Sequence, residues 1–202
     1  MRILALELST ARGTVAWLDG SLEFAREWPN DRRNSAAFFK NLQEVHAKFG
    51  APETIIVGLG PGSYAGIRIA ISAAVGLQLS SQSRLIGWPS IGAMETDAAE
   101  YSVIGDARRA SFFLARIVRN EVVESPSLFS GPDLQVKLES IDPAMPIFSS
   151  EVLPQFDRPV ISYPSALVLA RVAQEPQRGF FLPPLQPIYL RAPHITSPKS
   201  RT

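Results

Sequence analysis

The stretch that most constrains the fold is an apolar strand that runs through a glycine-rich turn into a long apolar helix. Residues 54–59 (T-I-I-V-G-L) form a continuous apolar and β-branched run, which is typical of a strand covered on both faces. Gly60 and Gly62 follow at once, and apolar spacing beyond them predicts a helix over residues 64–80. A strand of this kind lies in a sheet with helices on both sides, so the sequence predicts an α/β protein.

The helix expected over residues 64–80 is apolar nearly all the way round. One face, which we assign to the sheet, carries Ile67, Ile71, Ala74 and Val75. The opposite face carries the small and apolar residues Ile69, Ala73, Gly76 and Leu77. A helix without a polar face must be covered on both sides. The second cover is either the helix predicted over residues 35–49 of the same chain or a helix of a partner protein.

The glycine-rich turn has two interpretations. Gly58, Gly60 and Gly62 lie between a strand and a helix, where backbone N–H groups and the positive end of a helix bind anions. The pattern is neither G-x-G-x-x-G nor a Walker loop, and no lysine follows it. We therefore prefer a structural turn made by Gly60, Gly62, Ser63 and Gly66, with Ser63 as the N-cap of the helix.

The first hundred residues contain a regular series of strands and helices. Two strands over residues 3–8 and 13–18 form a hairpin, and residues 22–28 add a third, antiparallel strand. The helix over residues 35–49 follows, with one apolar stripe. This stripe consists of Phe38, Leu42, Val45 and Phe49. After the central strand and helix, residues 85–88 predict another strand and residues 90–99 a third helix.

A second hairpin, with strands over residues 103–106 and 111–118, starts this order again and indicates a duplicated architecture. Most prolines of the chain lie beyond it, and only one further helix, over residues 164–174, is predicted. We therefore expect an N-terminal domain over residues 1–99 and a smaller, more irregular one over 100–190. The polar tail over residues 191–202 is expected to be poorly ordered.

Composition excludes several classes of function. The chain of 202 residues has no cysteine, which excludes disulfides and thiolate chemistry. Its two histidines, His46 and His194, belong to no zinc-binding pair, so we predict no metal site. The net charge of +1 gives no uniform attraction to nucleic acid or membrane. No segment approaches the length of a membrane span, and a cytoplasmic protein is expected.

Four motifs, at residues 3–10, 60–70, 106–109 and 187–191, lie in the right order along nearly the whole chain and resemble those of the TsaB (YeaZ) family. Residues 60–70 read G-P-G-S-Y-A-G-I-R-I-A, close to the family signature G-P-G-S-F-T-G-L-R-I-G. Residues 3–10 (I-L-A-L-E-L-S-T) resemble the family opening I-L-A-I-D-T-S-T. Residues 106–109 (D-A-R-R) match the start of the second unit, and residues 187–191 (P-I-Y-L-R) match the P-x-Y-L-R motif near the C-terminus.

The resemblance implies the actin-like, sugar-kinase-like (ASKHA) fold, in which each of two related α/β domains opens with a β-hairpin. It also implies a non-catalytic subunit that pairs with TsaD, a related subunit that binds ATP and metal, and with the ATPase TsaE. That complex transfers threonylcarbamoyl to adenosine 37 of tRNA. The implied cofactors of this chain are therefore none, its contact with tRNA is indirect, and it has no membrane partner.

The resemblance places the docking surface on the two helices over residues 35–49 and 64–80, and a homodimer can use the same helices. The implied partner-binding residues are Phe39, Gln43, His46, Tyr64, Ile69, Ala73, Gly76 and Leu77. A vestigial phosphate site is implied at Glu7, Ser9 and Thr10. The chain departs from the family in having Glu7 for aspartate, Asn34-Ser35 for His-Ser, and Ala65 for threonine, which indicates a divergent member.

The second half of the chain argues against a working ATP site. After Gly105 only Gly131 and Gly179 remain, whereas nucleotide-binding members need glycine-rich backbone there. The second hairpin turn carries Arg108 and Arg109, whose bulk would crowd a phosphate. With Arg116 and Arg119 they form either a phosphate-contacting patch or, as we prefer, a solvated strand face. Two alternative functions stay open: a stand-alone actin-fold ATPase or sugar kinase, and, more weakly, a glycoprotease-like peptidase.

Overall fold

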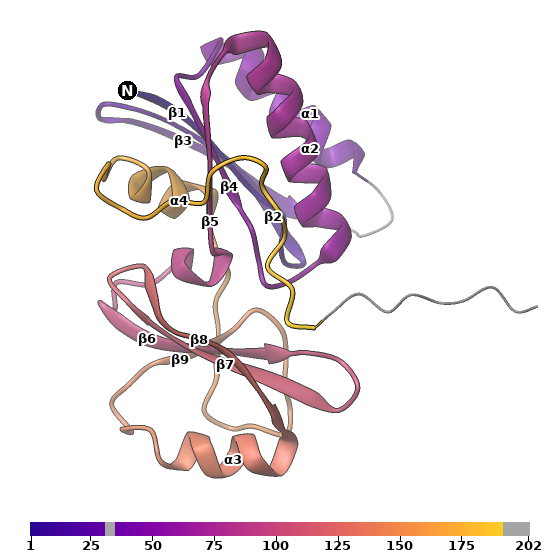
Figure 1. The fold of residues 1–202 in the computed structure, drawn as a ribbon, viewed down its shortest axis with the longest axis vertical. Helices are drawn as coiled ribbons and strands as arrows, with labels where there is room; N and C mark the ends of the chain where they lie inside the picture. Colours follow the sequence, from indigo (N-terminus) through magenta and orange to yellow (C-terminus); the bar gives the residue numbers. More distant parts are fainter. Residues whose placement is uncertain (31–34, 192–202) are drawn as a thin grey trace, which may run out of the picture.

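The computed structural model describes residues 1–30 and 35–191, which form two α/β units stacked along the long axis (Figure 1). Asn34, which departs from the TsaB (YeaZ) pattern, His194 and the tail beyond Arg191 lie outside the described residues. None of the described helices is both long and apolar enough to cross a membrane.

The first unit is built on a five-stranded sheet with the order β3-β2-β1-β4-β5. Its strands are β1 (Arg2–Glu7), β2 (Arg12–Asp19), β3 (Leu22–Pro29), β4 (Thr54–Gly58) and β5 (Arg84–Trp88). The first three strands pair antiparallel, while β4 and β5 run parallel to β1. The hairpin, the third strand and the strand into the glycine turn are therefore confirmed, with bounds within a residue or two of those expected.

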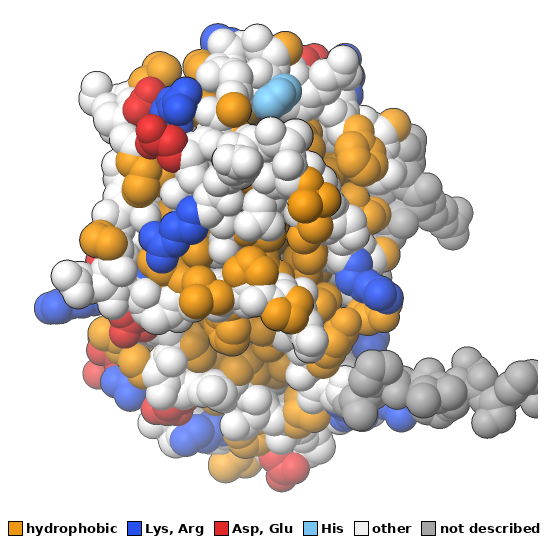
Figure 2. Space-filling model, turned by 45° about the horizontal axis from the view of Figure 1, so that its top comes forward, with side chains coloured by type: hydrophobic (Ala, Val, Ile, Leu, Met, Phe, Trp, Pro, Cys, Tyr) orange, Lys and Arg blue, Asp and Glu red, His pale blue; other side chains and the backbone are white. Residues whose placement is uncertain are grey.

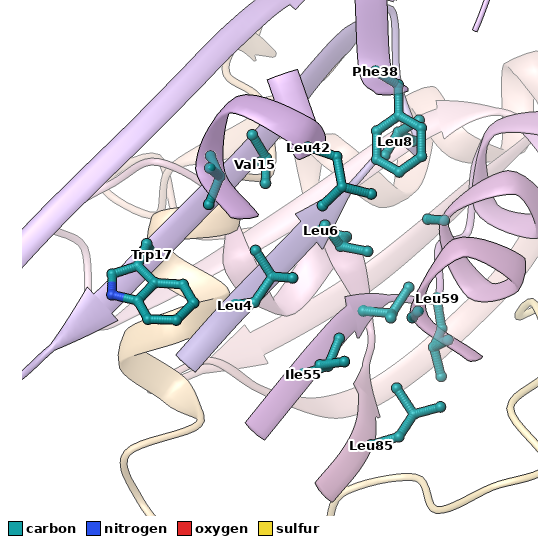
Figure 3. Close-up of a cluster of buried hydrophobic side chains, with 14 of the residues drawn as sticks. Leu4, Leu6, Leu8, Val15, Trp17, Phe38, Leu42, Ile55, Leu59 and Leu85 are labelled. Atoms are coloured by element: carbon teal, nitrogen blue, oxygen red, sulfur yellow. The ribbon is translucent and has the colours of Figure 1, made fainter. Parts of the chain in front are cut away.

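Helices cover both faces of this sheet, as the uninterrupted apolar run of β4 requires. The helices α1 (Ala36–Phe49) and α2 (Tyr64–Ser81) lie on one face, and α4 (Ala166–Val172) lies on the other (Figure 1). Side chains alternate between the two cores along β1. Leu4 and Leu6 point into the core under α1 and α2 (Figure 3), while Ile3 and Ala5 pack with α4.

The second unit repeats the topology of the first. Its strands are β6 (Glu100–Asp106), β7 (Ser111–Val118), β8 (Glu121–Ser130), β9 (Ile147–Ser149) and β10 (Val160–Ile161). The order β10-β9-β6-β7-β8 is that of the first sheet, with an antiparallel hairpin, a third antiparallel strand and two parallel strands. The helix α3 (Gly131–Glu139) packs on this sheet through Leu134 and Leu138. The predicted duplication and fold class are confirmed.

Two expectations about elements differ from the structure. The helix expected over residues 90–99 is wrong, because only a short 3₁₀ turn, η1 (Ser90–Ala93), forms there. Met94 is extended and bridges to Pro164, and Glu95 N–H donates to the Tyr163 carbonyl, so contacts distant in sequence replace helix bonds. The helix α4, expected among the elements of the second unit, packs against the first sheet.

The junction between the units is held by specific polar contacts near the end of β5. Trp88 Nε1 donates to the carbonyl oxygen of Asn120 (3.0 Å), and Asn120 Nδ2 donates to the carbonyl oxygen of Gly92 (2.9 Å). Arg178 Nη1, beyond α4, donates to the carbonyl oxygen of Arg119 (2.9 Å). The turn between β7 and β8 is therefore fastened to the first unit.

Candidate functional site

The glycine-rich turn before α2 packs directly on the first hairpin turn. The backbone N–H of Ser63 donates to the carbonyl oxygen of Ser9 (2.6 Å), and the Ser63 side chain caps α2 by accepting from Gly66 N–H (3.3 Å). A Cβ atom at Gly62 would lie 2.2 Å from the carbonyl oxygen of Ser9, and one at Gly66 would lie 2.2 Å from that of Leu8. Backbone carbonyl groups thus occupy the start of the helix, which favours a packing role for this turn over an anion site.

The backbone conformation of Gly60 and its hydrogen bonds with Ser90 of η1 add two further constraints on the same turn. Gly60 has a φ of +92°, a conformation that side chains other than glycine rarely adopt. Gly60 also exchanges two hydrogen bonds with Ser90, its N–H donating to Ser90 Oγ (2.9 Å) and its carbonyl accepting from Ser90 N–H (2.8 Å). The turn is therefore fixed at both ends, at Gly60 by η1 and at Ser63 by the first hairpin.

The residues suggested as a vestigial phosphate site are largely engaged within the protein. Glu7 is fully buried, and its Oε1 accepts from the backbone N–H of Ser9 (2.6 Å). Burial raises the pKa of Glu7, and hydrogen bonds from Ser9 and Ser90 lower it only in part. Thr10 Oγ1 donates to the carbonyl oxygen of Arg12 (3.1 Å). Phosphate binding by these residues stays a prediction.

Two cavities, of about 510 Å³ and 660 Å³, open where the two units meet. The smaller one is lined by Ser9, Thr10 and the start of α2 on one side and by Arg108 of the second hairpin turn on the other. Tyr64 and Tyr189 also line it, and their rings pack at a tilt with centroids 5.6 Å apart. The larger one is mainly apolar, and Figure 2 shows hydrophobic side chains gathered across the middle of one face of the molecule.

The partner-binding residues predicted on α1 share one exposed face. Phe39, Gln43 and His46 recur at helical spacing and are all exposed, with Phe39 50% accessible. The predicted apolar stripe lies on the other side of α1, where three of its four residues are buried and Phe49 is half-buried. The stripe is thus confirmed as the packing face of this helix.

The faces of α2 differ in part from those expected. Ile67, Ala70 and Ala74 are buried against the sheet, whereas Val75, which we assigned to the sheet side, is 38% exposed. The assignment of Val75 is wrong because the buried face is centred one residue earlier, on Ala74. Leu79, one turn beyond Val75, is 80% exposed and was missed, although the same spacing could have identified it.

The remaining predicted residues of α2 lie at or beside this exposed face. Tyr64 and Gly76 are exposed, and a Cβ atom at Gly76 would meet nothing within 4 Å. Ile69, Ala73 and Leu77 are half-buried at the margin of the core. We name Phe39, Gln43, His46, Tyr64, Ile69, Ala73, Val75, Gly76, Leu77 and Leu79 the docking face.

The arginines of the second hairpin do not form a common free patch. Arg116 Nε donates to Glu100 (2.7 Å) and its Nη1 to Glu124 (3.2 Å), so its charge is paired on the strand face. Arg108 pairs with Asp106 (3.1 Å). Among residues 1–30 and 35–191, no three histidine or acidic side chains gather as metal ligands.

Two sheets of identical strand order, each opening with a hairpin and separated by a cleft, define an actin-like α/β protein of two units. Two YeaZ-like structures from Pseudomonas aeruginosa share this fold, with TM-scores of 0.73 and 0.74 at 21% and 19% identity. The match covers 94% of this chain in both and 99% and 100% of those chains.

Comparison at the level of sequence finds two further similarities. Residues 34–125 match the family model described as TsaD, tRNA N6-adenosine threonylcarbamoyltransferase. The chain is 30% identical over 132 residues to the Escherichia coli (strain K12) protein named tRNA threonylcarbamoyladenosine biosynthesis protein TsaB. This match covers 60% of the chain and spans 57% of the length of that relative. The chain is thus similar in sequence and in fold to proteins named TsaB or YeaZ.

Proposed function

We propose that this chain is a non-catalytic, TsaB-like scaffold subunit that binds and activates a TsaD-like subunit in the formation of threonylcarbamoyladenosine in tRNA. The observation that carries the proposal is the uncovered apolar face of α2. The relative from E. coli named for this pathway and the match to the TsaD family model support it.

The exposed side of α2 has the character of an interface core. From Ile69 to Ser81 the helix carries no charged residue, although it borders solvent along its length. The centres of protein interfaces are similarly depleted of charge. Gly76 adds a flat spot between the exposed side chains of Val75 and Leu79, where a partner helix can approach closely. Neither α1 nor the rest of the described chain covers this side.

The same proposal assigns the remaining components to other proteins. ATP and metal are bound by the TsaD-like subunit, and this chain needs no cofactor. A TsaE-like ATPase joins the complex, and tRNA is contacted through the TsaD-like subunit. In the absence of that subunit, a second copy of this chain docks through the same helices. The proposed complex acts in the cytoplasm.

The docking proposal is tested by placing a charge on the face without disturbing the core. In Gly76→Glu the new side chain enters open space, and in Ala73→Arg it starts from a half-buried position. An unpaired charge buried in an interface costs several kcal/mol, so binding to the TsaD-like subunit should weaken by roughly 100-fold or more. The measurements are sedimentation with and without that subunit and thermal melting by circular dichroism.

The matched control is Val136→Arg, because Val136 is 68% exposed on α3 of the other unit. This variant should bind like the wild type. All three variants should melt within a few degrees of the wild type. Normal binding by both Ala73→Arg and Gly76→Glu would refute the docking role of α2.

A further inference from the structure

Glu7 has no part in the docking face, yet its carboxyl group is fully buried at the end of β1. It lies within a few residues of the first hairpin turn, and its Oε2 has no hydrogen bond of standard geometry within the part of the chain that is described. A buried carboxyl group is costly to keep in a fold. Its retention at this place therefore calls for a specific role.

Two sets of contacts start at this carboxyl group and end at opposite ends of the turn before α2. On one side, Oε1 accepts from Ser9 N–H (2.6 Å), and the carbonyl of Ser9 accepts from Ser63 N–H (2.6 Å). On the other side lies Ser90, whose Oγ and the Glu7 carboxyl group both lie beside Gly58, and this Oγ accepts from Gly60 N–H (2.9 Å). Gly60 and Ser63 lie at the two ends of the turn that leads into α2.

The packing around the carboxyl group leaves it little freedom to move. A Cβ atom at Gly58, at the end of β4, would lie 1.8 Å from Glu7 Oε2 and 2.7 Å from Ser90 Oγ. The turn itself is equally tight, since the glycines at positions 62 and 66 touch the carbonyl groups of residues 9 and 8. A small displacement of the hairpin turn would therefore be transmitted to the start of α2.

We propose that Glu7 is a positioning residue for α2: its carboxyl group holds Gly60 and Ser63 through Ser90 and Ser9, and so fixes the direction in which the docking face is presented. The part of this inference that concerns docking rests on the proposed function. The part that concerns the start of α2 does not.

The first test uses the isolated protein and amide hydrogen exchange. Glu7→Leu removes the acceptor at similar volume, whereas Glu7→Gln keeps an oxygen that can accept from Ser9 N–H. In Glu7→Leu the amides of Gly60 and Ser63 should exchange at least tenfold faster, and in Glu7→Gln they should stay within twofold of the wild type. If Glu7→Leu does not fold, Glu7→Ala, which also removes the acceptor, takes its place with the same expected exchange at both amides.

The control for a general loss of stability is Leu134→Ala, which creates a cavity in the core of the second unit. It should lower the melting temperature without selective exchange at Gly60 and Ser63. If Glu7→Leu, or Glu7→Ala in its place, shows no more exchange at these amides than Leu134→Ala, the positioning role is refuted.

The second test measures binding of the same variants to the TsaD-like subunit. Glu7→Leu should weaken binding at least tenfold, while Glu7→Gln and Leu134→Ala should stay within twofold of the wild type. Faster exchange at Ser63 combined with normal binding would overturn the link between Glu7 and the docking face. If the wild type itself does not bind the TsaD-like subunit, the proposed function fails, whereas the exchange result still decides the role of Glu7 at the turn.

Discussion

Glu7 lies where the opening motif of the TsaB (YeaZ) family has an aspartate. Its side chain is longer by one methylene group, so its carboxyl group lies farther from the backbone of β1 than that of an aspartate would. The carboxyl group reaches the space beside Gly58, where the Cβ atom of any other residue would overlap it. It is also removed from water, and burial favours the neutral form of a carboxylic acid. Hydrogen bonds from Ser9 and Ser90 favour the charged form but do not outweigh burial, so the pKa of Glu7 is raised.

This raised pKa predicts a pH dependence of stability that the variant Glu7→Gln lacks. Between the ordinary pKa of a glutamic acid and the raised value, the folded state binds more protons at Glu7 than the unfolded state does. The contribution of Glu7 to the free energy of unfolding therefore falls as the pH rises through this window, by at most about 1.4 kcal/mol per pH unit.

Melting curves of the wild type and Glu7→Gln between pH 4 and pH 8 measure this directly. The difference in melting temperature, wild type minus variant, should decrease as the pH rises. Exposed carboxylates such as Glu23 and Glu53, whose pKa values are lowered by Arg171 and Arg2, are present in both proteins and cancel in the difference. A difference that stays constant or grows with pH contradicts the prediction.

At the scale of elements, the sequence predicts those that have a strong periodic pattern and misses those that depend on distant contacts. The helices α1 and α2 and the strand β4 follow from apolar spacing alone. The strand β8 was missed because it contains Pro126, which an edge strand tolerates since one side of its backbone is unpaired. The helix α3 was missed although Ser130 caps it and Pro132 lies in its first turn, signals that its short length obscured.

The candidate site likewise contains residues whose exposure the sequence predicts and residues for which it does not. Exposure of Phe39, Gln43 and His46 follows from the stripe on the opposite face of α1, so it was predictable. On α2 both faces are apolar, and periodicity alone cannot tell which is buried; Val75 was misplaced for this reason. The contact of Glu7 with Ser9 depends on local backbone geometry, and its proximity to Ser90 joins segments far apart in the chain. No periodic pattern in the sequence predicts either of them.

The turn before α2 gives a prediction at this scale, in which two glycines of one segment respond oppositely to alanine. Gly62→Ala places a methyl group 2.2 Å from a backbone carbonyl that cannot rotate away, so stability should fall by about 1–3 kcal/mol. Gly76→Ala adds a methyl group in open space within a helix, where alanine is favoured by up to about 1 kcal/mol. Denaturant unfolding measures both. Equal effects of the two changes would show that the turn is not tightly packed.

At the scale of the whole molecule, the two units are related in topology and are joined by polar contacts in addition to the chain itself. The contacts of Trp88 and Asn120 fasten the turn between β7 and β8 to the first unit. Arg178 adds a hydrogen bond to the carbonyl of Arg119 and an ion pair with Glu121 (3.3 Å), and its side chain is only 9% exposed. Breaking this junction would leave several partly buried polar groups without their protein partners, which has a cost in free energy.

These polar contacts oppose a closure of the two units around nucleotide, which the alternative, an actin-fold ATPase, requires. We expect the purified chain to hydrolyse no ATP above the blank, and Mg-ATP to leave its radius of gyration, measured by X-ray scattering, unchanged. The physical reasons are the junction and the second hairpin turn, where Arg108 and Arg109 have positive φ and present bulky side chains instead of a glycine-rich phosphate loop.

Substituting Glu7 by alanine is the control for contaminating activity, because an ATPase of this fold would use the acidic residue of its first hairpin. Hydrolysis that survives purification and disappears in Glu7→Ala, together with compaction on adding Mg-ATP, would establish the enzyme and refute the scaffold.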